Sequence, residues 1–345
     1  MAAAHAPQVH DYTFEAPFAL ALGGSVAGLR LRYSVWGTPR ADGSNVVWVC
    51  HALTGSHRVD TWWPGLVGPG KYFDPAHWCI VCANVPGSCY GSTGPLSVPP
   101  GRLSPYFHQF PRWTSRDVAR ALEQLARALG FGPLHTVIGG SMGGQHALEW
   151  LLVAPGRFAH AALLCSNAVS SGWGRAFDAT QRRAIEADPT WPGRHPKAGT
   201  VGMQLARQVA MLSYRTFEIY GERASSVSAA EGYQQHQGRR LAQRFNAYSY
   251  WYLSHLLSHH DVGEGRGGVA AALAQVQAQT LVVGIGQDVL FPVAEQKRMA
   301  RHIPGARYAE LASDYGHDGF LIETDALATV LQQFYRQPHS NLHVV

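Results

Sequence analysis

The 345-residue sequence has little charge and almost no lysine. Charged residues make up 15% of it, and only three of its 28 basic residues are lysines. Apolar residues reach 46%, which excludes a disordered, highly charged chain and predicts a large buried core. The arginines are scattered along the sequence, so the net charge of +5 indicates an arginine-rich surface rather than a nucleic-acid site.

Long apolar runs are also missing. No stretch approaches the ~20 apolar residues of a membrane-spanning helix, and the 37 glycines follow no collagen-like period. The first residues lack the basic segment and apolar run of a secretory signal. We therefore expect a soluble, cytoplasmic globular protein whose partners include neither a membrane nor a nucleic acid.

Cysteine is scarce, with five in the chain. Cys79 and Cys82 have C-x-x-C spacing, but no second pair follows at the distance typical of a zinc ribbon. The two lie in a continuous apolar run, which predicts a buried strand in which cysteine is a small hydrophobe. We therefore expect no metal.

Short apolar runs that end at turn residues are the most regular feature of the sequence. Runs that are apolar on both faces are typical of parallel strands covered by helices. Amphipathic helices are predicted between them at 115–130, 145–153 and 325–335. This alternation predicts an α/β protein with a mostly parallel sheet flanked by helices. The predicted strands are 46–50, 78–82, 135–138, 161–165 and 280–285.

The alternation stops between residues 168 and 276. Strand-like runs are absent there, and helical patterns follow one another at 179–187, 203–212, 229–241 and 248–258. We interpret 168–276 as a helical insertion, or lid, that folds together with the sheet. Residues 1–167 and 277–345 then form the core.

The turn at Gly139-Gly140-Ser141-Met142-Gly143 has the pattern G-x-S-x-G. It follows a predicted strand directly and precedes a predicted helix, which is the context of a nucleophilic serine. Such a turn exposes the serine hydroxyl at the carboxyl end of a strand. An ordinary glycine-rich turn is the alternative, but the strand and helix on either side favour Ser141 as a catalytic nucleophile.

A serine nucleophile needs a histidine base and an acid that orients it, in the chain order Ser, Asp or Glu, His. Asp288 ends a predicted strand, and His317 follows between glycines before the last helix. The oxyanion needs two backbone N–H donors. Met142 follows the nucleophile, and Leu53 lies in the loop after the first buried strand, so these two are the candidates.

The sequence resembles the homoserine O-acetyltransferase family of the α/β-hydrolase superfamily. The resemblance implies the α/β-hydrolase fold with an inserted helical lid, a homodimer formed through that lid, and no metal or prosthetic group. It implies that Ser141, Asp288 and His317 form the catalytic triad. The matching motifs lie at 50–55, 62–71, 84–95, 139–144, 206–215 and 316–321.

The family pattern also places the amino-acid acceptor at Arg207, Tyr214 and Asp318. A guanidinium suits the acceptor carboxylate and an aspartate suits its ammonium. Without the resemblance, Arg207 is read as a surface helix residue and Tyr214 as a core aromatic. The chain departs from the family pattern at 171–178, where Trp173 and Asp178 replace smaller or amide side chains.

The resemblance implies acetyl transfer from acetyl-CoA to the hydroxyl of L-homoserine, by a ping-pong reaction through an acyl-serine, in methionine biosynthesis. L-serine as acceptor and succinyl-CoA as donor are alternatives on the same scaffold. A carboxylesterase is a more distant alternative, because the triad alone does not distinguish water from another acceptor. A non-catalytic binding module is disfavoured, since every triad residue and both oxyanion loops are present.

Overall fold

The computed structural model describes residues 6–336. Residues 1–5, in which no secretory signal is predicted, and 337–345, the end of the predicted core segment, lie outside this range. An eight-stranded sheet forms the centre of the molecule, with the strand order β1-β4-β6-β5-β7-β8-β9-β10. The strands are β1 (Gln8–Thr13), β4 (Arg30–Trp36), β5 (Val46–Cys50), β6 (Cys79–Ala83), β7 (Leu134–Gly140), β8 (Phe158–Leu164), β9 (Gln279–Ile285) and β10 (Arg307–Leu311).

The sheet is parallel from β6 through β10, while β4 pairs antiparallel with β1 and with β6. A separate hairpin joins β2 (Phe18–Ala19) and β3 (Ser25–Val26). Every residue of β5 and β6 is buried, as expected for strands covered on both faces. The predicted mostly parallel sheet flanked by helices is confirmed.

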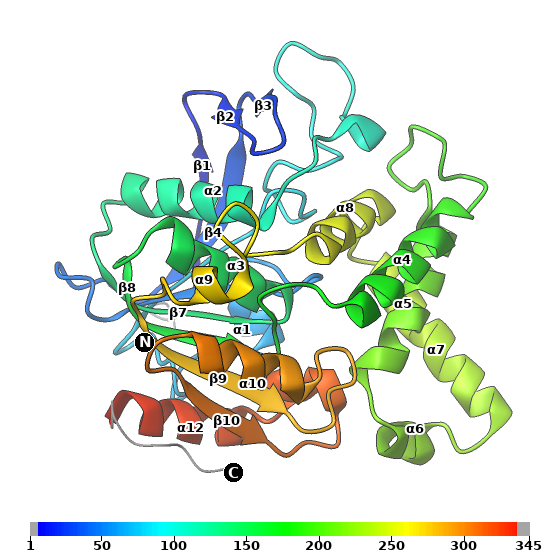
Figure 1. Cartoon of the computed structure of the whole chain (residues 1–345). Helices are drawn as coiled ribbons and strands as arrows, with labels where there is room; N and C mark the ends of the chain where they lie inside the picture. The colour runs from blue at the N-terminus through cyan, green and yellow to red at the C-terminus, as the bar shows by residue number, and fades with distance from the viewer. Residues whose placement is uncertain (1–5, 337–345) are drawn as a thin grey trace.

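Helices cover both faces of the sheet (Figure 1). One apolar core contains side chains from α2 and α3, and the other contains side chains from α12 and from Val59 of α1. The core helices are α1 (Val59–Trp62), α2 (Ser115–Ala128), α3 (Met142–Val153), α10 (Val293–His302), α11 (Gly319–Ile322) and α12 (Thr324–Arg336), with 3-10 turns η2 (Phe107–Gln109) and η3 (Gly316–Asp318).

Cys79 and Cys82 both lie in β6, the buried strand that the apolar run predicted. Side chains alternate along a strand, so two residues three positions apart point to opposite faces. Cys79 accordingly belongs to one core cluster and Cys82 to the other. The C-x-x-C spacing therefore does not bring the two thiols together.

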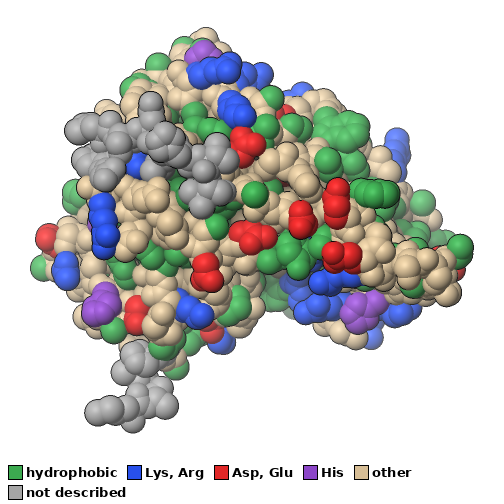
Figure 2. Space-filling model, turned by 90° about the horizontal axis from the view of Figure 1, so that it is seen from below, with side chains coloured by type: hydrophobic (Ala, Val, Ile, Leu, Met, Phe, Trp, Pro, Cys, Tyr) green, Lys and Arg blue, Asp and Glu red, His purple; other side chains and the backbone are tan. Residues whose placement is uncertain are grey.

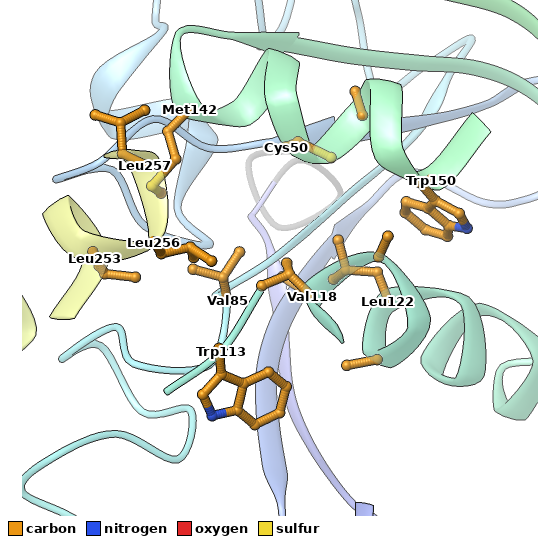
Figure 3. Close-up of a cluster of buried hydrophobic side chains, with 14 of the residues drawn as sticks. Cys50, Val85, Trp113, Val118, Leu122, Met142, Trp150, Leu253, Leu256 and Leu257 are labelled. Carbon is orange, nitrogen blue, oxygen red and sulfur yellow. The ribbon is translucent and has the colours of Figure 1, made fainter. Parts of the chain in front are cut away.

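Most of the segment between β8 and β9 lies at one side of the sheet, while its last helix lies beside α10 (Figure 1). Its side chains share a core with the sheet: Leu253, Leu256 and Leu257 of α8 pack in the cluster that contains Met142 (Figure 3). This continuity of the core ties the segment to the sheet. Its helices are α4 (Gly172–Glu186), α5 (Thr200–Tyr214), α6 (Phe217–Arg223), α7 (Val227–Ala242), α8 (Ala247–Ser258) and α9 (Val269–Leu273). No helix in 6–336 is both long and apolar enough to cross a bilayer.

Candidate active site

Ser141 lies at the turn between β7 and α3. Its backbone has φ 57° and ψ −127°, a conformation that L-residues rarely adopt and that persists only when the surroundings impose it. A Cβ at Gly143 would lie 2.1 Å from the carbonyl oxygen of Cys50, so the turn packs against β5 at a distance that excludes any larger residue. This strained strand-to-helix turn is the geometry expected of a nucleophilic serine.

His317 and Asp288 are in direct contact. His317 Nδ1 lies 2.7 Å from Asp288 Oδ2, and both side chains are buried. The other carboxylate oxygen, Oδ1, accepts the backbone N–H groups of Leu290 and Phe291 at 2.9 and 2.8 Å. Three hydrogen bonds thus fix the carboxylate, which in turn fixes the imidazole and leaves Nε2 on the side away from Asp288.

Two opposing effects set the pKa of His317. Burial alone lowers the pKa of the imidazole, but the charge of Asp288 and its hydrogen bond outweigh burial, with a smaller contribution from Asp318. The pKa therefore lies above the ordinary value of 6.5. The ring of Phe291 stacks on the imidazole with centroids 5.1 Å apart, which restricts its rotation.

The loop after β5 and Ser141 line one pocket of about 540 Å³. His51 links this loop to the loop after β6. Its Nε2 accepts the N–H of Val85 at 3.0 Å, and its Nδ1 lies 2.8 Å from the carbonyl oxygen of Ala52. Within residues 6–336, the N–H groups of Leu53 and Met142 donate to no protein acceptor. Both remain free to bind an oxyanion.

The pocket brings together residues that are far apart in the sequence. Of the predicted site residues, it is lined by Leu53, Ser141, Arg207, Tyr214, His317 and Asp318. Asp288 lies behind His317, and Met142 is fully buried next to Ser141. The volume of this pocket, about 540 Å³, is in the range of pockets that hold small molecules.

Arg207 and Tyr214 reach the pocket from the last two turns of α5. The guanidinium of Arg207 lies over the ring of Tyr214, 5.1 Å from its centroid, and the Tyr214 ring lies 5.6 Å from the imidazole of His317. Burial raises the pKa of Tyr214 to about 12, so its hydroxyl stays protonated. Among the described residues, Arg207 has no hydrogen bond and no ion pair with the protein.

Asp318 has a protein partner that the sequence did not indicate. Arg215, directly after α5, places Nη2 3.1 Å from Asp318 Oδ2, with both side chains 16% exposed. The two are 103 positions apart, so no local pattern predicts the pair. Arg215 is, however, the last residue of the 206–215 motif, which was the one available signal. Tyr90 and Arg244 also line the pocket and were not predicted.

The 171–178 stretch, where the chain departs from the family pattern, lies outside this pocket. Trp173 Nε1 donates to the carbonyl oxygen of Val289 at 2.6 Å, one residue after Asp288. Asp178 is buried and accepts a hydrogen bond from Ser258 Oγ at 2.9 Å. Trp173 therefore contacts the loop that carries Asp288 rather than the space beside Ser141.

Comparisons with known proteins agree on the fold and on the family. The model of the alpha/beta hydrolase fold matches residues 45–324. Homoserine O-acetyltransferase of Cyclobacterium marinum is 43% identical over 319 residues, covering 91% of each chain. The crystal structure of homoserine O-acetyltransferase from Staphylococcus aureus aligns with a TM-score of 0.83, 30% identity and 98% coverage of both chains.

An esterase also has this fold. The crystal structure of esterase E22 aligns with a TM-score of 0.88 over 95% of this chain and 100% of its own, at 20% identity. A likeness at that identity shows the fold alone, whereas 43% identity over nine-tenths of the chain shows the family. The chain belongs to the homoserine O-acetyltransferase family of α/β-hydrolase-fold proteins.

Proposed function

We propose that this chain transfers an acetyl group from acetyl-CoA to the side-chain hydroxyl of L-homoserine, through an acetyl ester on Ser141. One observation carries the proposal beyond the shared fold: an arginine without an acidic partner faces the nucleophile pocket. Arg207 lines the pocket and has no carboxylate partner among the described residues. An acceptor that brings its own carboxylate supplies that partner, whereas water does not.

In the first half-reaction, Ser141 Oγ attacks the thioester carbonyl carbon and His317 Nε2 takes the hydroxyl proton. The N–H groups of Leu53 and Met142 stabilise the oxyanion. The carbon–sulfur bond then breaks, and the thiolate takes the proton from Nε2. The hydrogen bond from Nδ1 to Asp288 keeps the imidazole in the tautomer that has a free lone pair on Nε2.

In the second half-reaction, the homoserine hydroxyl gives its proton to His317 Nε2 and attacks the acetyl carbon. The ester bond to Ser141 breaks, and the serine oxygen recovers the proton. Arg207 binds the acceptor carboxylate. Asp318 binds its ammonium through Oδ1, since Arg215 occupies Oδ2.

Transferase and esterase activities make different predictions for Arg207→Ala. In the transferase, the variant loses about tenfold to a hundredfold in kcat/KM for homoserine, but one equivalent of CoA is still released from acetyl-CoA alone. Arg183→Ala, which removes an exposed arginine of α4 paired with Glu186, is the matched control. Wild-type turnover that is equally fast without homoserine would contradict the transferase proposal.

The same assay separates the alternative substrates. L-serine replaces homoserine in one arm and succinyl-CoA replaces acetyl-CoA in another, and thiol release is followed in each. The homodimer through the lid and the cytoplasmic location stay predictions.

A further inference from the structure

A second pocket, of about 270 Å³, opens beside the catalytic pocket. Seven residues line it: five arginines, one glutamine and one leucine. None of them is an aspartate or a glutamate. Figure 2 shows Lys and Arg side chains gathered on the side of the molecule where α6 and α7 lie in Figure 1, with acidic side chains next to them. The five arginines are Arg207, Arg215, Arg223, Arg240 and Arg244.

Little within the protein neutralises this charge. Of the five guanidinium groups, that of Arg215 alone is paired with a carboxylate in the described residues, and its Nε and Nη1 atoms are buried without a hydrogen-bond partner. Arg244 donates to the carbonyl oxygen of Thr54 and to the hydroxyl of Tyr90, both neutral. The four guanidinium groups without a carboxylate partner within residues 6–336 repel one another, and an anionic ligand removes that cost.

The two pockets are adjacent. Arg207, Arg240 and Arg244 line both of them, so a ligand whose reactive end is at Ser141 passes these arginines on its way out. A carboxylate offers two oxygens and one negative charge, whereas a diphosphate offers more of both, so a site with several arginines favours phosphate groups over a single carboxylate. Acyl-CoA has this form, because its thioester is joined by a long arm to a diphosphate and a 3′-phosphate.

We propose that this arginine pocket, between α5, α6 and α7, binds the phosphate groups of the acyl-CoA donor through Arg223, Arg240 and Arg244, while Arg207 binds the acceptor carboxylate. The inference rests on the proposed function and adds to it the place where the donor is held. Arg223 lines only the second pocket and not the catalytic one, so its contribution is to donor binding and not to acceptor binding.

The test compares two thioesters. Acetyl-CoA carries phosphates, whereas S-acetyl-N-acetylcysteamine has the same reacting group without them. Arg223→Ala raises KM for acetyl-CoA about threefold to tenfold, and Arg223→Ala combined with Arg240→Ala raises it further. For the short thioester, kcat/KM of Arg223→Ala stays within about twofold of the wild type. Added salt weakens acetyl-CoA binding more in the wild type than in the double variant.

Arg239→Ala is the matched control. Arg239 is the exposed neighbour of Arg240 on α7, contacts Gln235 at 3.3 Å and lines neither of these pockets. Its KM for acetyl-CoA stays at the wild-type value. If Arg239→Ala and Arg223→Ala have equal effects, or if Arg223→Ala impairs both thioesters equally, the subsite proposal is wrong.

A titration that does not depend on turnover separates the two proposals. CoA and pantetheine are titrated into Ser141→Ala protein, with and without Arg223→Ala, and inorganic phosphate serves as a third probe. The subsite predicts that CoA binds more tightly than pantetheine and that Arg223→Ala removes most of the difference. If CoA binds but Arg223→Ala changes nothing, the subsite alone is wrong. If CoA does not bind at all, both the subsite and the proposed donor are wrong.

Discussion

At the scale of single residues, Ser141 combines a strained backbone with a position in the lining of the 540 Å³ pocket. In the proposed reaction, Ser141→Ala removes the covalent route and lowers kcat by several orders of magnitude. The protein still folds, because the hydroxyl makes no hydrogen bond with the described residues. Mass spectrometry of wild type with acetyl-CoA alone detects an acetyl group on Ser141 that the variant lacks; near-normal activity of the variant contradicts the assignment.

The raised pKa of His317 predicts a pH dependence. The base must be neutral, so kcat/KM for acetyl-CoA rises with pH through an apparent pKa above 6.5. In Asp288→Asn the charge that raises this pKa is gone, so the residual activity is lower and its acid limb moves to lower pH. A pH series of initial rates for both proteins measures the shift. A flat wild-type profile from about pH 5.5 to 8, with chemistry rate-limiting, contradicts the role of His317.

At the scale of elements, α4 buries a carboxyl group. Burial raises the pKa of Asp178 to about 7, while the unfolded chain ionises near 3.8. The unfolded state therefore releases its proton first, and the free energy of unfolding falls as pH rises from about 4 to about 7. Asp178→Asn keeps an acceptor for Ser258 and removes this loss, so its Tm exceeds that of wild type by about 2 °C or more at pH 8.

The difference in Tm between Asp178→Asn and wild type is smaller at pH 5, because the wild-type carboxyl is mostly protonated in the folded protein at that pH. Thermal unfolding of both proteins at the two pH values measures the difference. A variant that is less stable than wild type at pH 8 contradicts the pKa argument.

The parts of the fold that the sequence predicts are those whose pattern is local. β5 to β9 were recognised because buried parallel strands are apolar on both faces. β1, β4 and β10 were missed, since strands such as Arg307–Leu311 alternate buried and half-buried side chains and never form an apolar run. α10 (Val293–His302) was missed because only Gln296 and Met299 are buried in it.

The candidate site, too, is predictable from the sequence only where its pattern is local. The turn at Ser141 has a local signature, and the glycines around His317 gave a weaker one. The ion pair between Arg215 and Asp318 depends on how the end of α5 packs against η3, which no sequence spacing encodes. The roles of Arg207 and Asp318 are predicted by the resemblance to a family and not by the residues around them in the sequence.

At the scale of the whole molecule, the exposed face of α5 is apolar. Val201, Leu205 and Leu212 are 64%, 48% and 57% exposed, and their spacing places them along one stripe of the helix. Phe217, at the start of α6, is 88% exposed. Apolar surface of this kind is typical of an interface between chains, and it supports the prediction of a homodimer through the lid.

Leu205→Asp combined with Leu212→Asp places two charges in that surface, so we expect the dimer to dissociate into monomers. Light scattering after size-exclusion chromatography measures the mass. Leu103→Asp, at a fully exposed leucine outside the lid, is the control and leaves the mass unchanged. Equal masses for all three proteins contradict a dimer through α5.

The residues that break and form bonds in the proposed reaction and two of the three that bind its acceptor come from different parts of the chain, while the third, Asp318, directly follows His317. Ser141, Asp288 and His317 lie on loops of the sheet, whereas Arg207 and Tyr214 lie on α5. A substitution of Arg207 on α5 therefore changes which nucleophile accepts the acyl group, but it leaves in place the residues that activate Ser141. An enzyme built in this way evolves towards new acceptors by drift in its lid, while the inherited chemistry stays intact.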